Sequence, residues 1–238
     1  MTYAVLSSQA PQKCIDKLRS IGFTPLLLPP FERLSPPVST HADMLFFSYN
    51  DYIITHKEYR KVAKSVFEVL EGSCNIHIIE SDDNVGANYP FDIAYNAIVI
   101  NNTLFSYTNH TSGEILKFAG AQGISSSMVK QGYTACSTLK LSDSHVITAD
   151  PSLAQKYRQY GIKVTQTSSG SIVLPPYDYG FIGGASGVFE DTVFFAGDIG
   201  KLADGNAVLK AISECAMNFV SLSEEMLCDI GGIKFFKA

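Results

Sequence analysis

Residues 43–80, DMLFFSYNDYIITHKEYRKVAKSVFEVLEGSCNIHIIE, contain in one stretch the pattern that decides the fold. Apolar and β-branched residues predict short strands over residues 44–48 and 52–55, joined by a turn at Tyr-Asn-Asp. Apolar residues at helical spacing predict an amphipathic helix over residues 57–71. Residues 75–80 predict a third strand. The order is therefore strand, strand, helix, strand.

The same order of elements recurs along the chain, about every 40–50 residues. Further copies are predicted to begin near residues 95, 137 and 186. Asn101-Asn102 indicates the hairpin turn of one copy, and Asp150-Pro151 indicates the N-cap and first residue of the helix in the next. A fifth copy is divided between the chain ends, because residues 232–237 would pair with residues 3–7.

These patterns predict an α/β fold of five ββαβ units. A unit completed by both chain ends indicates a five-bladed α/β propeller with pseudo-fivefold symmetry, closed by the C-terminal strand pairing in the N-terminal unit. Short strands would lie inside and helices outside. An open α/β sheet is the alternative, but its parallel strands do not use the hairpins that recur here.

The composition predicts one globular domain over residues 1–238. Apolar residues make up 46% and charged residues 17%, and the net charge is −5 without a long run of one sign. A basic stripe for nucleic acid is missing, and no apolar run approaches the roughly 18 residues of a membrane span. We expect a cytoplasmic protein, since the N-terminus does not read as a signal peptide. Its five widely spaced cysteines predict reduced thiols, not disulfides or a zinc site.

The strongest candidate for chemistry is Cys136, in the stretch Gly132-Tyr-Thr-Ala-Cys136-Ser-Thr-Leu-Lys-Leu141. It lies just before the start of a predicted strand, where a thiol can act as a nucleophile if a base takes its proton. His41, two residues before Asp43, is the best candidate for that base. The alternatives are a buried strand thiol and a structural histidine, and the sequence leaves both open.

Three stretches, together with the repeat, resemble one known superfamily. His41-Ala-Asp43-Met-Leu-Phe-Phe is similar to its His-Leu-Asp-Thr-Val-Phe motif, and the Cys136 stretch resembles its Gly-Gly-Pro-Arg-Cys-Met-Ser-Met motif. Cys228-Asp229-Ile-Gly231-Gly232 looks like its acidic-Gly-Gly motif. The superfamily is the penteins, or guanidino-group modifying enzymes, which include arginine deiminase and dimethylarginine dimethylaminohydrolase. The chain is also similar to uncharacterised bacterial proteins described only by this fold.

The resemblance implies a cysteine-dependent hydrolase or amidinotransferase acting on a guanidino or amidino small molecule, with an arginine-like substrate as one option. Cys136 would form a covalent thiouronium-type intermediate, His41 would act as general acid and base, and Asp43 would hold either the guanidinium or His41. Neither a metal nor a cofactor is implied. The alternative is a pentein without catalysis, serving as a binding or ligand-sensing module. A homodimer is one open option for the oligomeric state.

Further residues are predicted to bind the substrate. Asp229 is the acidic residue closest to the acid of the acidic-Gly-Gly motif. When the two glycines are aligned, however, the motif's acid corresponds to Ile230, one residue later. In a regular strand this shift would turn the Asp229 side chain to the other face. Asp92 and Asn96 open the unit between His41 and Cys136. Gly183, Gly184 and Ser186 belong to a glycine-rich stretch that either offers backbone amides to a ligand or packs tightly. The superfamily's arginine-rich clamp for a substrate carboxylate is not found.

Overall fold

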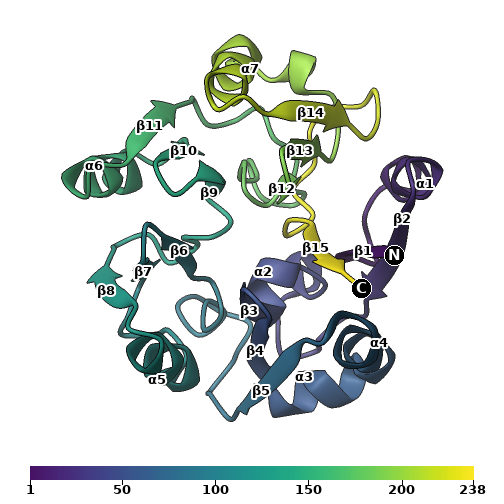
Figure 1. Ribbon diagram of the computed structural model, residues 1–238, viewed down its shortest axis with the longest axis vertical. Helices are drawn as coiled ribbons and strands as arrows, with labels where there is room; N and C mark the ends of the chain where they lie inside the picture. Colours follow the sequence, from purple (N-terminus) through teal and green to yellow (C-terminus); the bar gives the residue numbers. More distant parts are fainter.

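The computed structural model describes all 238 residues and has a mixed α/β fold with five three-stranded sheets. The sheets are arranged around a common centre, with the crossover helices at the periphery and the short helix α2 (Ala42–Leu45) near the centre (Figure 1). In every sheet the middle strand is antiparallel to the first strand and parallel to the third. Four units are thus a hairpin followed by a helical crossover, and in the remaining unit the antiparallel pair comes from the two ends of the chain, as the sequence predicts.

The elements group into five units that each provide one sheet. The first unit is β15 (Lys234–Lys237), β1 (Thr2–Ser7), α1 (Gln12–Ser20) and β2 (Phe23–Leu28). The second is α2 (Ala42–Leu45), β3 (Phe46–Tyr49), β4 (Tyr52–His56), α3 (Lys57–Val62), α4 (Lys64–Cys74) and β5 (His77–Ser81). The third is β6 (Ile98–Ile100), β7 (Thr103–Ser106), α5 (Gly113–Ala121) and β8 (Ser125–Met128).

The last two units follow the same order. The fourth is β9 (Thr138–Ser142), β10 (His145–Thr148), α6 (Pro151–Gln159) and β11 (Lys163–Gln166). The fifth is β12 (Ser186–Phe189), β13 (Thr192–Phe195), α7 (Gly205–Glu214) and β14 (Asn218–Ser221). Two short 3₁₀ helices, η1 (Pro36–Val38) and η2 (Ile199–Lys201), lie in connecting segments.

The strands at the two ends of the chain pair with each other. β15 runs antiparallel to β1, with Thr2 opposite Lys237 and Val5 opposite Lys234. The N–H of Ala238 also donates to the carbonyl of Met1 at 2.9 Å. The first sheet is therefore built from both ends of the chain, which lie side by side in Figure 1.

Two local predictions in the second unit need correction. Residues 44 and 45 belong to the helical turn α2 and not to a strand, because the amides of Met44 and Leu45 both donate to the carbonyl of His41. The single helix predicted over residues 57–71 is divided at Ala63, which accepts from the amides of Val66 and Phe67 and so starts a second helix. Both changes depend on packing that a local pattern does not contain.

Other local predictions are confirmed. Asn101 and Asn102 both have positive φ, at 48° and 54°, as a tight hairpin turn between β6 and β7 requires. The side chain of Asp150 accepts from the amides of Ser152 and Leu153, so it caps α6 with Pro151 as the first helical residue. These signals are local, so the sequence alone contains them.

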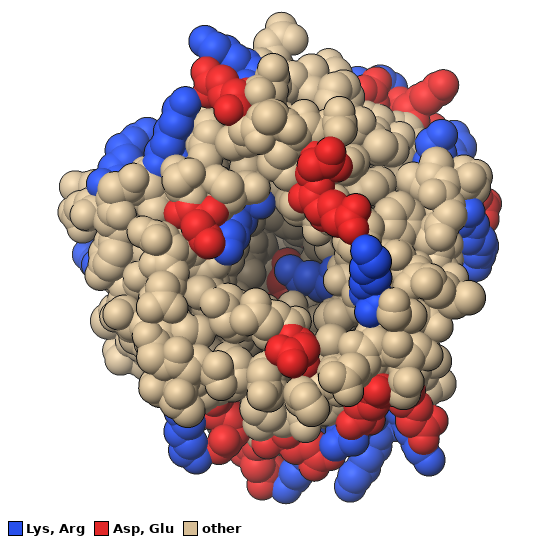
Figure 2. Space-filling model, in the orientation of Figure 1, with Lys and Arg blue, Asp and Glu red and all other residues tan.

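The first strands of the five sheets, β3, β6, β9, β12 and β15, surround a central well of about 390 Å³. It is open on the face shown in Figure 2, with basic side chains inside. Apolar side chains pack in four separate clusters between sheets and helices, the largest with 30 buried residues. Residues of the largest cluster, Phe46, Phe47 and Phe236 among them, also line the central well.

Candidate functional site

The predicted site residues occupy equivalent places in the five units. His41 lies just before the helical turn α2 and Asp43 lies within it, and α2 leads directly into β3. Asn96 comes just before β6. Cys136 lies in a turn two residues before β9. Gly183 and Gly184 precede β12, and Asp229 precedes β15 in the same way. Because the first strands surround one centre, the segments before them converge.

Hydrogen bonds join these five segments in a closed circuit. The amide of Gly184 donates to the carbonyl of Cys136 at 3.0 Å, and the amide of Gly232 donates to the carbonyl of Gly184 at 2.7 Å. The amide of Asp43 donates to the carbonyl of Gly231 at 3.1 Å. The side chain of Asn96 completes the circuit and is the one side chain in it.

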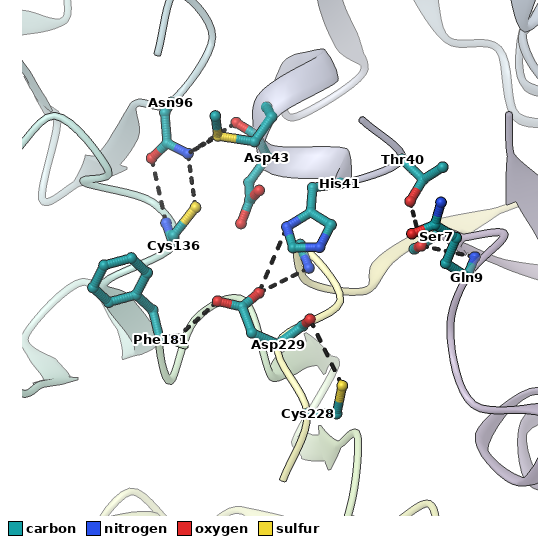
Figure 3. Close-up of polar contacts among 12 residues, drawn as sticks. Ser7, Gln9, Thr40, His41, Asp43, Asn96, Cys136, Phe181, Cys228 and Asp229 are labelled. Atoms are coloured by element: carbon teal, nitrogen blue, oxygen red, sulfur yellow. Dashed lines mark hydrogen bonds and ion pairs between the residues drawn. The ribbon is translucent and has the colours of Figure 1, made fainter. Parts of the chain in front are cut away.

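Asn96 connects the histidine segment to the cysteine segment. Its Nδ2 donates to the carbonyl of Asp43 at 3.1 Å and to Cys136 Sγ at 2.8 Å. Its Oδ1 accepts from the amides of Ala135 at 2.7 Å and Cys136 at 3.3 Å. These hydrogen bonds hold the backbone of Asp43 and Cys136 and the Cys136 thiol (Figure 3), and the predicted role of Asn96 in substrate binding stays a prediction.

His41 is the N-cap residue of α2 and is buried. Gly231, with φ at 75°, lies directly against it, and a Cβ at Gly231 would overlap the backbone and side chain of His41. This close approach needs glycine for its conformation and for its size. It brings the imidazole Nδ1 to 3.7 Å from Asp229 Oδ1 (Figure 3).

Asp229 therefore faces the site, contrary to the strand-alternation argument. Gly231 and Gly232 both have positive φ, so the segment is not a regular strand and alternation does not apply. Ile230, on which the aligned acid would fall, is buried in an apolar cluster. The Asp229 carboxylate accepts from the amides of Phe181 at 2.8 Å and Gly231 at 3.0 Å.

Two buried carboxylates, Asp43 and Asp229, lie next to the thiol and the imidazole (Figure 3). Asp43 Oδ1 has no hydrogen-bond partner. Burial, and then the negative charge of Asp43, raise the pKa of Asp229 to about 7. A buried, unpartnered carboxylate oxygen is costly, so this pair is suited to accept a cation or a donor group from a ligand.

The same surroundings keep the reactive groups neutral. Burial raises the pKa of the Cys136 thiol well above its usual value, and the charges of Asp43 and Asp229 raise it further. Burial lowers the pKa of the His41 imidazole, and the charge of Asp43 acts in the opposite direction. Both shifts favour the neutral forms of the thiol and the imidazole, which line the same cavity.

Cys136, His41 and Asp229 line one cavity of about 240 Å³. Its other walls include Met44, Tyr133 and Phe181. The Tyr133 and Phe181 ring centroids are 5.9 Å apart, so part of the cavity wall is a pair of aromatic rings. The sequence prediction misses both aromatic residues, although Tyr133 lies inside the Cys136 motif and Phe181 inside the glycine-rich stretch.

Asp92 lies behind the wall of this cavity. It is buried, and its Oδ2 accepts from the Tyr133 hydroxyl at 2.7 Å. Burial raises the pKa of Asp92. The hydrogen bond orients the Tyr133 ring, so Asp92 acts on the cavity through Tyr133 and is not among the residues that line it.

The glycine-rich stretch packs against the site at close range. A Cβ at Gly184 would overlap the Asp229 carboxylate, and a Cβ at Gly183 would overlap backbone carbonyls of residues 135–138. The Gly184 amide already donates to Cys136. Ser186 donates its hydroxyl to the carbonyl of Ile182, and with Gly183 it lines the central well. The observed contacts are those of tight packing, and a role of these three residues in substrate binding stays a prediction.

The structure contains no group of three or more His, Cys, Asp or Glu side chains placed to hold a metal ion. None of its helices has the length and apolar character to cross a membrane.

Solved structures of guanidino-modifying enzymes have a similar fold. Dimethylarginine dimethylaminohydrolase from Pseudomonas aeruginosa, in complex with citrulline, matches with a TM-score of 0.53 and 12% identity over 94% of this chain and 91% of that chain. Agmatine deiminase from C. jejuni matches with a TM-score of 0.55 and 6% identity over 93% and 87%. An amidinotransferase of saxitoxin biosynthesis from Microseira wollei matches with a TM-score of 0.53 and 11% identity over 89% and 73%.

No curated protein matches the chain in sequence. The structural matches have identities of 12% or less, so they establish the fold. The sequence itself matches one family along residues 5–234, nearly its whole length. The chain has the pentein fold and belongs to the family of unknown function DUF6873.

Proposed function

We propose that the chain is a cysteine-dependent hydrolase or amidinotransferase for a small guanidino or amidino compound. The observation that carries the proposal is the presence of Cys136, His41 and Asp229 in one cavity. In this proposal residues 1–238 act as one domain, a closed five-bladed ring of pseudo-fivefold symmetry. The enzymes of similar fold that act on dimethylarginine or agmatine, or transfer amidino groups, support the reaction class.

The carboxylates explain how such a substrate would be held and how it would activate the thiol. A planar guanidinium can donate paired hydrogen bonds to carboxylates. Asp229 lines the cavity, and Asp43, buried beside the thiol, lines the adjoining central well. Its positive charge would offset the two negative charges that now raise the pKa of Cys136. The thiol is then deprotonated when substrate is bound.

The proposed reaction begins with the Cys136 thiol and the His41 imidazole in their neutral forms. The Cys136 proton passes to His41, and the thiolate forms a C–S bond with the guanidine carbon. His41 returns the proton to the departing amine as the C–N bond breaks, which leaves a thiouronium on Cys136. Water, deprotonated by His41, attacks that carbon and the C–S bond breaks, giving a urea and the free thiol. In a transferase, a second amine takes the place of water.

A binding or ligand-sensing module is the second candidate, and one observation favours it. The Cys136 thiol is buried and its pKa is raised well above the usual value, a state typical of an unreactive thiol. In that case a guanidino compound would bind between the carboxylates without forming a product.

The test is labelling with 2-chloroacetamidine, which places an amidinium next to an alkylating carbon. We expect a single adduct on Cys136, located by peptide mass spectrometry, and a much slower reaction in His41→Asn. Cys74→Ser is the matched control, since Cys74 is a half-buried thiol at the end of α4, and it should label as the unaltered protein does. Labelling at another cysteine would contradict the proposal.

Turnover separates the two candidates. Incubation with arginine, agmatine and methylated arginines, followed by mass spectrometry of the products, should yield a urea and an amine. That product should disappear in Cys136→Ala, while circular dichroism shows that the variant is folded. Saturable binding of a guanidino compound without any product or covalent adduct would support the binding module instead.

A further inference from the structure

The charges around the Cys136 cavity have one sign. Asp229 and Asp178 line it, and the carboxylate of Asp43 lies beside the thiol. No lysine or arginine is among the lining residues. A ligand with a carboxylate would therefore bring a negative charge to a cavity that holds negative charges and offers it no cation.

Arg33 is the arginine nearest in sequence to the residues that line the cavity, and its guanidinium is paired elsewhere. It comes two residues before Ser35, whose hydroxyl lies 3.4 Å from the hydroxyl of the cavity residue Tyr177. The Arg33 guanidinium instead pairs with Glu58 at 2.7 Å. The structure thus provides no arginine clamp for a ligand carboxylate.

Aromatic side chains form part of the cavity wall. Tyr133, Tyr177, Tyr179 and Phe181 all line it, and the Tyr179 and Phe181 ring centroids are 6.1 Å apart. Aromatic faces attract cations and pack against alkyl chains. The volume of about 240 Å³ is below the roughly 300–1,000 Å³ of pockets for drug-sized ligands. A short, flexible cation fits these walls.

Asp178 lies at the exposed edge of the cavity, between the exposed Tyr177 and Tyr179. Asp229, by contrast, is buried next to His41. The cavity is therefore lined by one buried and one exposed carboxylate, and aromatic rings form part of its walls. Such a placement suits a ligand with a positive charge at each end.

We infer that the substrate is a guanidino amine without a carboxylate. This inference rests on the proposed function. The guanidinium would lie between Asp43 and Asp229 near Cys136, the alkyl chain along Tyr133 and Phe181, and the ammonium at Asp178. An α-carboxylate on the same chain would face Asp178 without a cation to balance it.

Agmatine and arginine form a matched pair for the test, because they differ only in the carboxylate. Their binding to Cys136→Ser, in which the site cannot react, would be measured by isothermal titration calorimetry. We expect agmatine to bind at least about tenfold more tightly, the change that about 1.4 kcal/mol produces. Equal binding, or tighter binding of arginine, would overturn the inference.

Second variants locate the source of the preference. Asp178→Asn, introduced together with Cys136→Ser, should weaken agmatine binding about threefold, since an exposed carboxylate contributes only about 0.2–1 kcal/mol to an ion pair. Arg33→Gln should leave both affinities unchanged. Loss of arginine binding in Arg33→Gln would show that Arg33 moves to hold a carboxylate, and would overturn the inference.

Failure of this inference is distinguishable from failure of the proposed function. If arginine is converted and agmatine is not, the inference is overturned while the proposed function stands. If neither compound binds to Cys136→Ser and neither yields a product with the unaltered protein, both are overturned. If agmatine binds in preference to arginine without any product, the inference about the ligand stands and the catalytic proposal is overturned.

Discussion

Replacing Asn96 with alanine should destabilise the whole molecule, because its side chain completes the circuit of hydrogen bonds around the centre. The change removes the acceptor of the amides of Ala135 and Cys136, at 2.7 and 3.3 Å, and the donor to the carbonyl of Asp43. Asn96 is buried, so water does not readily replace these bonds. A buried group left without a partner costs about 1–3 kcal/mol.

The distances decide how these costs add. The amide of Ala135 is strongly bound, whereas the bond of Cys136 at 3.3 Å is long and contributes less. We therefore expect the free energy of unfolding to fall by about 2–4 kcal/mol in Asn96→Ala. The Cys136 thiol also loses the donor that lowers its pKa, so its alkylation should be slower.

Urea denaturation followed by circular dichroism measures the change. Asn218→Ala is the matched control, because Asn218 is exposed and donates to the exposed Asp191. Its effect should stay within about 0.5 kcal/mol. An equally small effect in Asn96→Ala would refute the view that this side chain joins the units.

Three further predictions concern the same site. Gly184→Ala should lower the free energy of unfolding by about 1–3 kcal/mol, since its Cβ would overlap the Asp229 carboxylate. Gly72→Ala, at an exposed position of α4, should not lower it. Equal effects of the two changes in urea denaturation would contradict this prediction. Asp229 has a pKa of about 7 in the folded protein and about 3.9 when unfolded. Between these two pH values the Asp229 carboxylate binds more protons in the folded state than in the unfolded state. The free energy of unfolding should therefore fall as pH rises from about 4 to 7. Asp229→Asn should remove much of that fall in urea titrations at each pH, and an unchanged pH slope would contradict the assignment. The ultraviolet absorbance of a thiolate, taken as the difference between the unaltered protein and Cys136→Ser, should be absent at pH 8 without ligand; a thiolate signal there would mean that burial does not keep the Cys136 pKa raised.

The repeat of elements could be predicted because its signals are local. Two asparagines with positive φ make a hairpin turn, and Asp150 followed by proline starts a helix, whatever the rest of the chain does. The helical turn over residues 42–45 and the break at Ala63 could not, since both depend on where the neighbouring units lie. Apolar residues there are compatible with strand or helix alike.

The site was predicted less completely than the fold. Cys136, His41 and Asp229 line the same cavity, as motif spacing led us to expect. Strand alternation does not give the orientation of Asp229, because Gly231 and Gly232 have positive φ and the segment is not a regular strand. The hydrogen bond between Asp92 and Tyr133 joins residues 41 positions apart, so no local sequence pattern predicts it.

The pairing of β15 with β1 has a consequence for synthesis of the protein. Thr2 leaves the ribosome long before Lys237, its partner in the sheet, has been made. Asp229 and Gly231, which both lie against His41, also come in these last residues. A nascent chain that already contains both Cys136 and His41 therefore lacks the cavity, which can form only after translation has passed residue 229.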